Sequence, residues 1–167
     1  MSTRARIVIT GKSMHNNAET HIIFIASDGY PSATLNHVKE AFKKSLAQCT
    51  AHNKRFDDKY TPNPAQLCGN IIGENSDVYG MHAHVVLSAA TAFSPDASLN
   101  FDFMVEWLYV IDLFKNTLKV YRGSIVGMPV DPTIYSKQLR EECQAKCVKS
   151  IKADVAALKK LGLKVTK

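Results

Sequence analysis

Hydrophobic and polar residues alternate most regularly near the middle of the chain. Every odd position of Phe101–Leu113 is apolar or aromatic, whereas the even positions between them are mixed. Side chains two residues apart share one face of a strand, so this stretch predicts a strand with one buried and one partly covered face. Trp107 lies in the middle of the odd series and is expected in the core. Lys115-Asn116 then predicts a turn, and Thr117–Tyr121 predicts the return strand of a hairpin.

Shorter apolar stretches predict three further strands, at Arg4–Thr10, His21–Ala26 and Gly80–Ser88. Apolar residues at spacings of three and four predict three helices: Ala33–Thr50, a short helix from Asn63-Pro64 to Gly73, and a long helix from Asp131-Pro132 to Gly162. Ala51–Thr61 shows no periodicity and is interpreted as a loop. Short links between strands favour hairpins. The expected fold is therefore α+β, with an antiparallel sheet of about five strands and three helices packed against it.

Charge is distributed unevenly along the chain and distinguishes its C-terminal segment from the rest. The 167 residues predict a single domain, because this length is enough to bury one hydrophobic core. Residues 1–131 contain 12 Lys or Arg and 12 Asp or Glu, whereas residues 132–167 contain nine and three. The whole excess of +6 thus falls in the last segment. The sequence predicts a charge-neutral α+β body followed by a long, basic C-terminal helix.

Cysteine content and hydropathy bear on the compartment. The four cysteines are thinly spread, and a chain of this size does not need disulfides to fold. A reduced, cytoplasmic protein of a host cell is therefore expected. No apolar run reaches the roughly 18 residues that a membrane-spanning helix requires, so no membrane partner is expected.

Three short motifs mark the starts of predicted elements or lie within them. They are Thr3-Arg4-Ala5 before the first strand, Asp28-Gly29-Tyr30-Pro31 before the first helix, and the run from Glu106 to Leu113 in the long strand. Together they resemble a group of small, mostly uncharacterised phage and prokaryotic proteins. The resemblance spans roughly residues 3–122 and implies a compact α+β domain of phage or mobile-element type. It supplies no catalytic residues, and the basic C-terminal helix is not part of the pattern.

The turn that contains Asp28 and Tyr30 is one candidate binding site. It connects a strand to a helix, and connecting segments often carry function. The same residues have ordinary structural uses, because Asp28 can bond to nearby backbone amides and Tyr30 can pack on the sheet. The sequence leaves both interpretations open.

A second candidate site is a pair of histidines, His82 and His84, in a predicted strand. Two imidazoles two residues apart on one face can begin a zinc site. A third ligand would have to come from elsewhere, with His21 or Asp77 as possibilities, and the spacing identifies neither. A polar, solvated sheet face explains the pair equally well. We therefore assign no metal and no cofactor, and expect the purified protein to carry no stoichiometric zinc.

The third candidate is a series of lysines on one side of the C-terminal helix, opposite its apolar stripe. The series comprises Lys146, Lys149, Lys152, Lys159 and Lys160. Such a face can meet phosphates or an acidic protein surface, and it can also be merely solvated. This helix contains a single arginine, Arg140, whereas base-specific recognition relies on the planar, bidentate donors of arginine.

These observations favour a binding protein over an enzyme. Neither a phosphate-binding glycine motif nor a catalytic constellation is apparent in the sequence. We expect a non-enzymatic protein of phage origin that docks on a host protein or defence complex and modulates it, for example as an inhibitor. The alternative is a nucleic-acid-binding module that uses the basic C-terminal helix.

Overall fold

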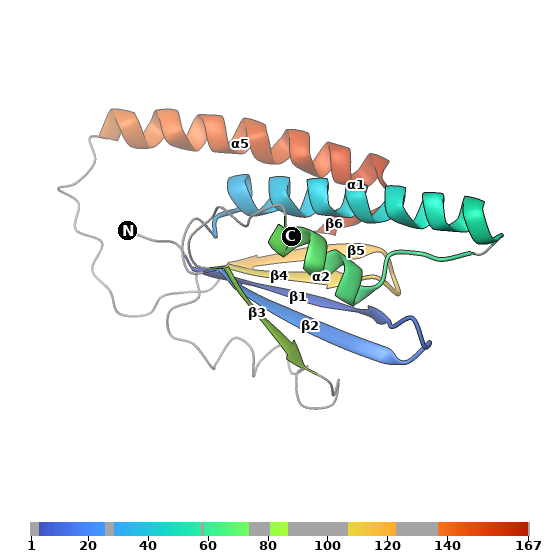
Figure 1. Cartoon of the computed structure of the whole chain (residues 1–167). Helices are drawn as coiled ribbons and strands as arrows, with labels where there is room; N and C mark the ends of the chain where they lie inside the picture. Colours follow the sequence, from blue (N-terminus) through green and yellow to red (C-terminus); the bar gives the residue numbers. More distant parts are fainter. Residues whose placement is uncertain are drawn as a thin grey trace.

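The computed structural model describes residues 4–25, 29–57, 59–73, 81–86, 107–122 and 137–166, with the backbone alone for 81–86, 122 and 137–148. These residues form one sheet with helices stacked on one of its faces (Figure 1). The predicted α+β class is confirmed.

The sheet has six strands in the order β3-β2-β1-β4-β5-β6. Their bounds are β1 Ala5–Lys12, β2 Ala18–Ile25, β3 Met81–Val86, β4 Trp107–Asp112, β5 Thr117–Arg122 and β6 Lys164–Thr166. The hairpins β1–β2 and β4–β5 are antiparallel, as predicted, with a left-handed residue, Asn116, in the second turn. β4 covers the second half of the predicted long strand, and residues 101–106 lie outside the described residues.

The expectation of a purely antiparallel sheet is wrong, because the sheet is mixed. β1 runs parallel to β4, with Ile7 opposite Tyr109 and Ile9 opposite Ile111. β5 likewise runs parallel to the short edge strand β6. The two hairpins are thus joined side by side through their first strands. Pairing between such distant segments is set by tertiary packing and leaves no mark on the period of either strand.

The described helices are α1 (Pro31–Phe56), α2 (Pro64–Gly73) and α5 (Lys137–Lys160). α1 begins two residues earlier and ends six residues later than predicted, so half of the expected loop after it is helical. α5 is shorter than the helix predicted from Asp131-Pro132, and residues 131–136 lie outside the described residues. Within the described part of the chain, no helix is long and apolar enough to span a bilayer.

The predicted boundaries of α2 and the predicted end of α5 are confirmed, and specific hydrogen bonds mark these helix ends. The Asn63 side chain accepts a hydrogen bond from the Gln66 N–H at 2.9 Å and caps α2. Gly162 adopts a left-handed φ of 91° after α5. The Leu163 N–H then donates to the Leu158 carbonyl at 2.9 Å, which closes the helix end.

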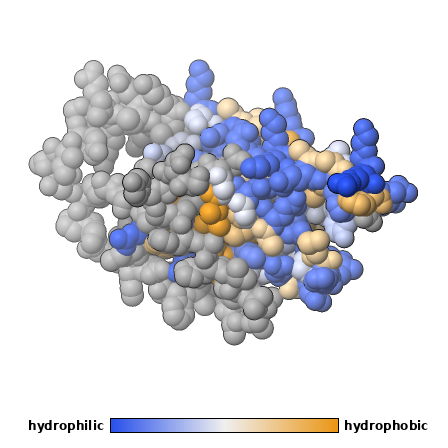
Figure 2. Space-filling model, viewed as in Figure 1, coloured by the Kyte–Doolittle hydropathy of each residue, from blue (hydrophilic) through white to orange (hydrophobic). Residues whose placement is uncertain are grey.

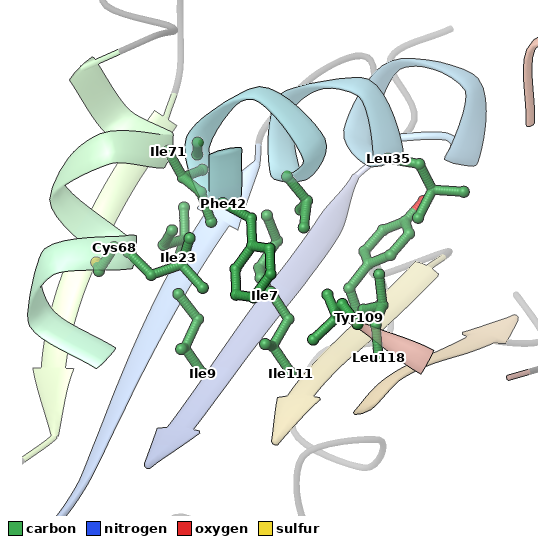
Figure 3. Close-up of a cluster of buried hydrophobic side chains, with 14 of the residues drawn as sticks. Ile7, Ile9, Ile23, Leu35, Phe42, Cys68, Ile71, Tyr109, Ile111 and Leu118 are labelled. Atoms are coloured by element: carbon green, nitrogen blue, oxygen red, sulfur yellow. The ribbon is translucent and has the colours of Figure 1, made fainter. Parts of the chain in front are cut away.

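The core lies between the sheet and the two helices α1 and α2. Figure 3 shows Phe42 of α1 and Ile71 of α2 above the strand residues Ile7, Ile23 and Ile111. Trp107 packs against this cluster but is only partly buried, so the prediction that it belongs to the buried core is wrong. It is the first residue of β4, at the end of the strand.

A polar network that runs from the buried Ser45 and Asn70 to the exposed Gln48 fixes α2 against α1. The Asn70 amide donates to the Ser45 hydroxyl at 2.8 Å and to the Gln48 side-chain oxygen at 2.9 Å. Gln66 also donates to Gln48, at 3.0 Å. Each of these bonds satisfies a polar atom at the helix interface, so the network defines how the two helices are oriented.

Candidate functional site

The turn between β2 and α1 is packed tightly onto the sheet. Gly29 is buried, and a Cβ there would lie 2.5 Å from the Ala5 Cβ, so a larger residue does not fit. The Tyr109 hydroxyl donates to the Gly29 carbonyl at 2.9 Å. Burial raises the pKa of Tyr109 well above its ordinary value, so the hydroxyl remains a donor. These contacts give the glycine a structural role at the start of β1 and β4.

Tyr30, the exposed member of this turn, caps the first turn of α1 through its backbone. Its carbonyl accepts from the Ala33 and Thr34 N–H groups at 3.1 and 3.0 Å. Its side chain is 39% exposed. Asp28, its predicted companion, lies outside the described residues. These contacts involve the Tyr30 backbone, so a binding role for its side chain stays a prediction.

The histidine pair lies in β3, an edge strand. The register pairs His82 with Phe24 and His84 with Ile22, and the side chains of both histidines lie outside the described atoms. His21, a suggested third ligand, pairs with Val85 instead, one position out of step with the histidine pair. Its buried ring contacts the Glu19 carboxylate. Among the described residues no group of three His, Cys, Asp or Glu side chains is placed to hold a metal ion.

Those α5 lysines whose side chains the structure describes lie on the exposed side of the helix. Lys149, Lys152, Lys159 and Lys160 are exposed, and Lys146 falls in the part of α5 described by its backbone. On the opposite side of the helix, Leu158 is fully buried and Ile151 and Val155 pack against the core. The predicted amphipathic arrangement thus holds over the second half of α5.

A buried ion pair fixes the rotation of α5 about its axis. Lys39 of α1 donates from Nζ to the Asp154 carboxylate at 2.9 Å, and the Asp154 side chain is only 8% exposed. This hydrogen bond raises the pKa of the Lys39 amine, burial opposes the effect, and Glu40 at 3.3 Å adds to it. With Asp154 held inward, Lys149, Lys152 and Lys159, which lie five, two and five residues away from it, fall on the opposite, outward side of the helix.

α1 is as basic as α5, although the segment 1–131 sums to zero charge. It contains five Lys or Arg and one acidic residue, Glu40. Lys43 and Lys44 are exposed, and α1 packs directly against α5 (Figure 1). Figure 2 shows hydrophilic atoms projecting along this helical side of the molecule. We define the basic helical surface as Lys43, Lys44, Lys149, Lys152, Lys159 and Lys160.

The C-terminal end of α1 carries a different kind of cluster, which the sequence reading missed. The His52 ring lies 4.7 Å from the Phe56 ring and 4.6 Å from the Tyr60 ring, centroid to centroid. Phe56 is 55% exposed and Tyr60 is 38% exposed. The Arg55 guanidinium lies 5.1 Å from the centre of the Phe56 ring. We define the aromatic tip as His52, Phe56 and Tyr60 together with the exposed cations Lys54, Arg55 and Lys59.

Hydrogen bonds between the Asn53 side chain and the Tyr60 backbone hold the loop of the aromatic tip in place. The Asn53 amide donates to the Tyr60 carbonyl at 2.9 Å, and the Tyr60 N–H donates back to Asn53 at 2.8 Å. Asp57 ends α1 in a left-handed conformation with φ of 54°. The loop thus returns Tyr60 to the side of α1 in a defined position.

Comparisons with protein-family models, curated proteins and solved structures gave no match.

The buried cysteines do not make a reactive site. Burial, with a smaller contribution from Glu19, raises the pKa of the Cys68 thiol to about 11. Burial also raises the pKa of Cys49, whose thiol donates to Gln66 at 3.4 Å. A raised pKa disfavours the nucleophilic thiolate, so both cysteines act as small core residues.

One sequence signal could have revealed the aromatic tip. His52 and Phe56 are four residues apart, which places them one turn apart on a helix. The predicted end of the helix at Thr50 hid this spacing, because residues beyond it were interpreted as loop. The charged residues at 54, 55, 57, 58 and 59 obscured the apolar period there.

Proposed function

We propose that this protein is a non-enzymatic binding protein of phage origin that docks on a host protein or defence complex in the cytoplasm and modulates it. The basic helical surface makes the contact, with an acidic surface of the partner opposite it. The motif resemblance supports the phage origin. The observation that carries the docking proposal is the set of six exposed lysines on two helices joined by the Lys39–Asp154 pair.

The chemistry of this surface favours a protein partner over a base-reading role. All six of its cations are lysines, which act as flexible point charges and not as the bidentate forks that recognise guanine. α5 contains no aromatic residue for stacking on bases. Charge complementarity with an acidic protein raises association rates and selects partners, which suits a modulator.

The test is affinity capture from a host lysate with and without nuclease, followed by mass spectrometry. The bait is the wild-type protein or the triple variant Lys149→Gln, Lys152→Gln and Lys159→Gln. The proposal predicts a protein that resists nuclease and is reduced at least about fivefold on the triple variant, as expected for loss of complementary charge.

The matched control changes three exposed lysines outside the helices, Lys12, Lys115 and Lys119, to Gln. It removes the same charge from β1, β5 and the turn between β4 and β5. We expect it to retain the partner at the wild-type level. Equal loss on both triple variants would show a general charge effect and would contradict docking through the helices.

Nucleic-acid binding is the second candidate function, and the aromatic tip is the observation that favours it. The tip supplies the exposed rings that α5 lacks, next to cations. Rings interleaved with cations are typical of surfaces that bind single strands. Partners lost from the capture after nuclease treatment would support this candidate over the first.

A further inference from the structure

We propose that the aromatic tip binds single-stranded nucleic acid by stacking an unpaired base on Phe56. This inference deepens the second candidate function and is independent of docking through the basic helical surface. Its starting point is that the exposed Phe56 belongs to a cluster of three rings with a guanidinium over it, rather than standing alone on the surface.

The position of the tip suits an extended strand. α1 continues past the end of α5, so its last turns project from the helical layer where the chain turns back toward α2 (Figure 1). Hydrophobic and strongly hydrophilic atoms lie side by side at this end of the molecule (Figure 2). A projecting helix end is accessible to the splayed bases of a single strand.

Different side chains of the aromatic tip would contact the base and the phosphate backbone of the nucleic acid. The Arg55 guanidinium lies over the Phe56 ring, which is 55% exposed, so a base can stack on the exposed part of this pair and the guanidinium can also contact phosphate. Lys54 and Lys59 are exposed on either side of this pair in the sequence and supply further phosphate contacts. The Asp57 carboxylate is exposed in the same loop and offsets part of this charge. Stacking must therefore carry most of the affinity, which makes the binding tolerant of sequence.

The tip is preorganised, which lowers the entropic cost of binding. The paired bonds between Asn53 and the Tyr60 backbone fix the loop, and the Tyr60 ring meets His52 edge-on at 90°. His52 in turn packs against Phe56. These contacts hold Phe56 in place before a ligand binds, so binding does not require the loop to become ordered.

Fluorescence anisotropy with labelled oligo(dT) and oligo(U) of about 12 nucleotides tests this inference, with a blunt duplex of equal length as comparison. At about 50 mM salt, where phosphate contacts are strong, we expect saturable single-strand binding and at least fivefold weaker duplex binding. Phe56→Leu keeps the apolar bulk and should weaken single-strand binding about tenfold, whereas Phe56→Tyr keeps the ring and should stay within about twofold.

Two controls separate this site from other features. Phe114, 52% exposed in the turn between β4 and β5, is the matched aromatic, and Phe114→Leu should leave binding unchanged. The triple lysine variant of α5 should retain single-strand binding within about threefold, since its charges lie outside the tip. Absence of saturable binding, equal affinity for the duplex, or wild-type affinity of Phe56→Leu would each overturn the inference. None of these results would affect nuclease-resistant capture of a protein partner.

Discussion

At the scale of single residues, the sequence predicted the chemistry of the turns and caps better than the burial of individual side chains. The sequence predicted the Asn63 cap, the end of α5 at Gly162 and the turn at Asn116, because each depends on local backbone geometry. The need for glycine at position 29 could not be predicted, because it arises from the close approach of Ala5, which is distant in the chain. The partial burial of Trp107 likewise depends on its tertiary surroundings and not on its place in the alternating pattern.

The buried thiol of Cys68 leads to a prediction about alkaline stability. The unfolded chain loses this proton near its ordinary pKa of 9.0, whereas the folded chain retains it to about 11. The stabilising contribution is therefore complete below pH 9 and is lost as the pH rises from 9 to 11, by about 2–3 kcal/mol. Denaturant unfolding of Cys68→Ala across this interval should show a fall in stability that is smaller by about that amount.

Cys49→Ala is the control for this experiment, because the hydrogen bond with Gln66 opposes the effect of burial there. We expect a smaller change in its pH dependence. An identical fall in stability for wild type and Cys68→Ala between pH 9 and 11, measured under reducing conditions, would contradict the assigned role of burial.

At the scale of helices and strands, hydrophobic period predicted which elements exist, but not which strands become neighbours. β1, α2 and β5 were predicted nearly at their observed bounds, whereas β2 begins three residues earlier than predicted and β4 covers only the second half of the predicted long strand. The sequence did not predict that β1 pairs with β4 or that β5 pairs with β6. It also did not predict β6 itself, which has only three residues. Short edge strands carry too few residues to show a period.

The contact between α1 and α5 is predicted to depend on the Lys39–Asp154 pair. Asp154→Ala removes the main partner of a partly buried ammonium group and should lower the free energy of unfolding by about 1.5–3 kcal/mol. The double variant Lys39→Met with Asp154→Leu should recover most of that loss, because it leaves no unpaired charge. Denaturation midpoints measure both. A midpoint for Asp154→Ala equal to that of wild type would show that the pair does not hold α5 in place.

At the scale of the whole molecule, the fold changes what the charge pattern means. The sequence separated a neutral body from a basic end, whereas the structure packs a basic α1 against a basic α5 on the same face of the sheet. The lysines of the predicted site are thus joined by Lys43 and Lys44. The aromatic tip at the far end of α1 adds a second surface of different chemistry, whose rings and cations could be recognised as a cluster only once α1 was known to continue to Phe56.

Lysine footprinting tests the central claim, docking through the basic helical surface, most directly. The protein is acetylated briefly, alone and bound to the nuclease-resistant partner, and the modification of each lysine is measured by mass spectrometry. We predict at least threefold protection of Lys149, Lys152, Lys159 and Lys160, because ammonium groups in a charged interface lose access to reagent. Lys12, Lys115 and Lys119 should react equally in both states. Protection of these three lysines, with unchanged reactivity along α5, would contradict the account.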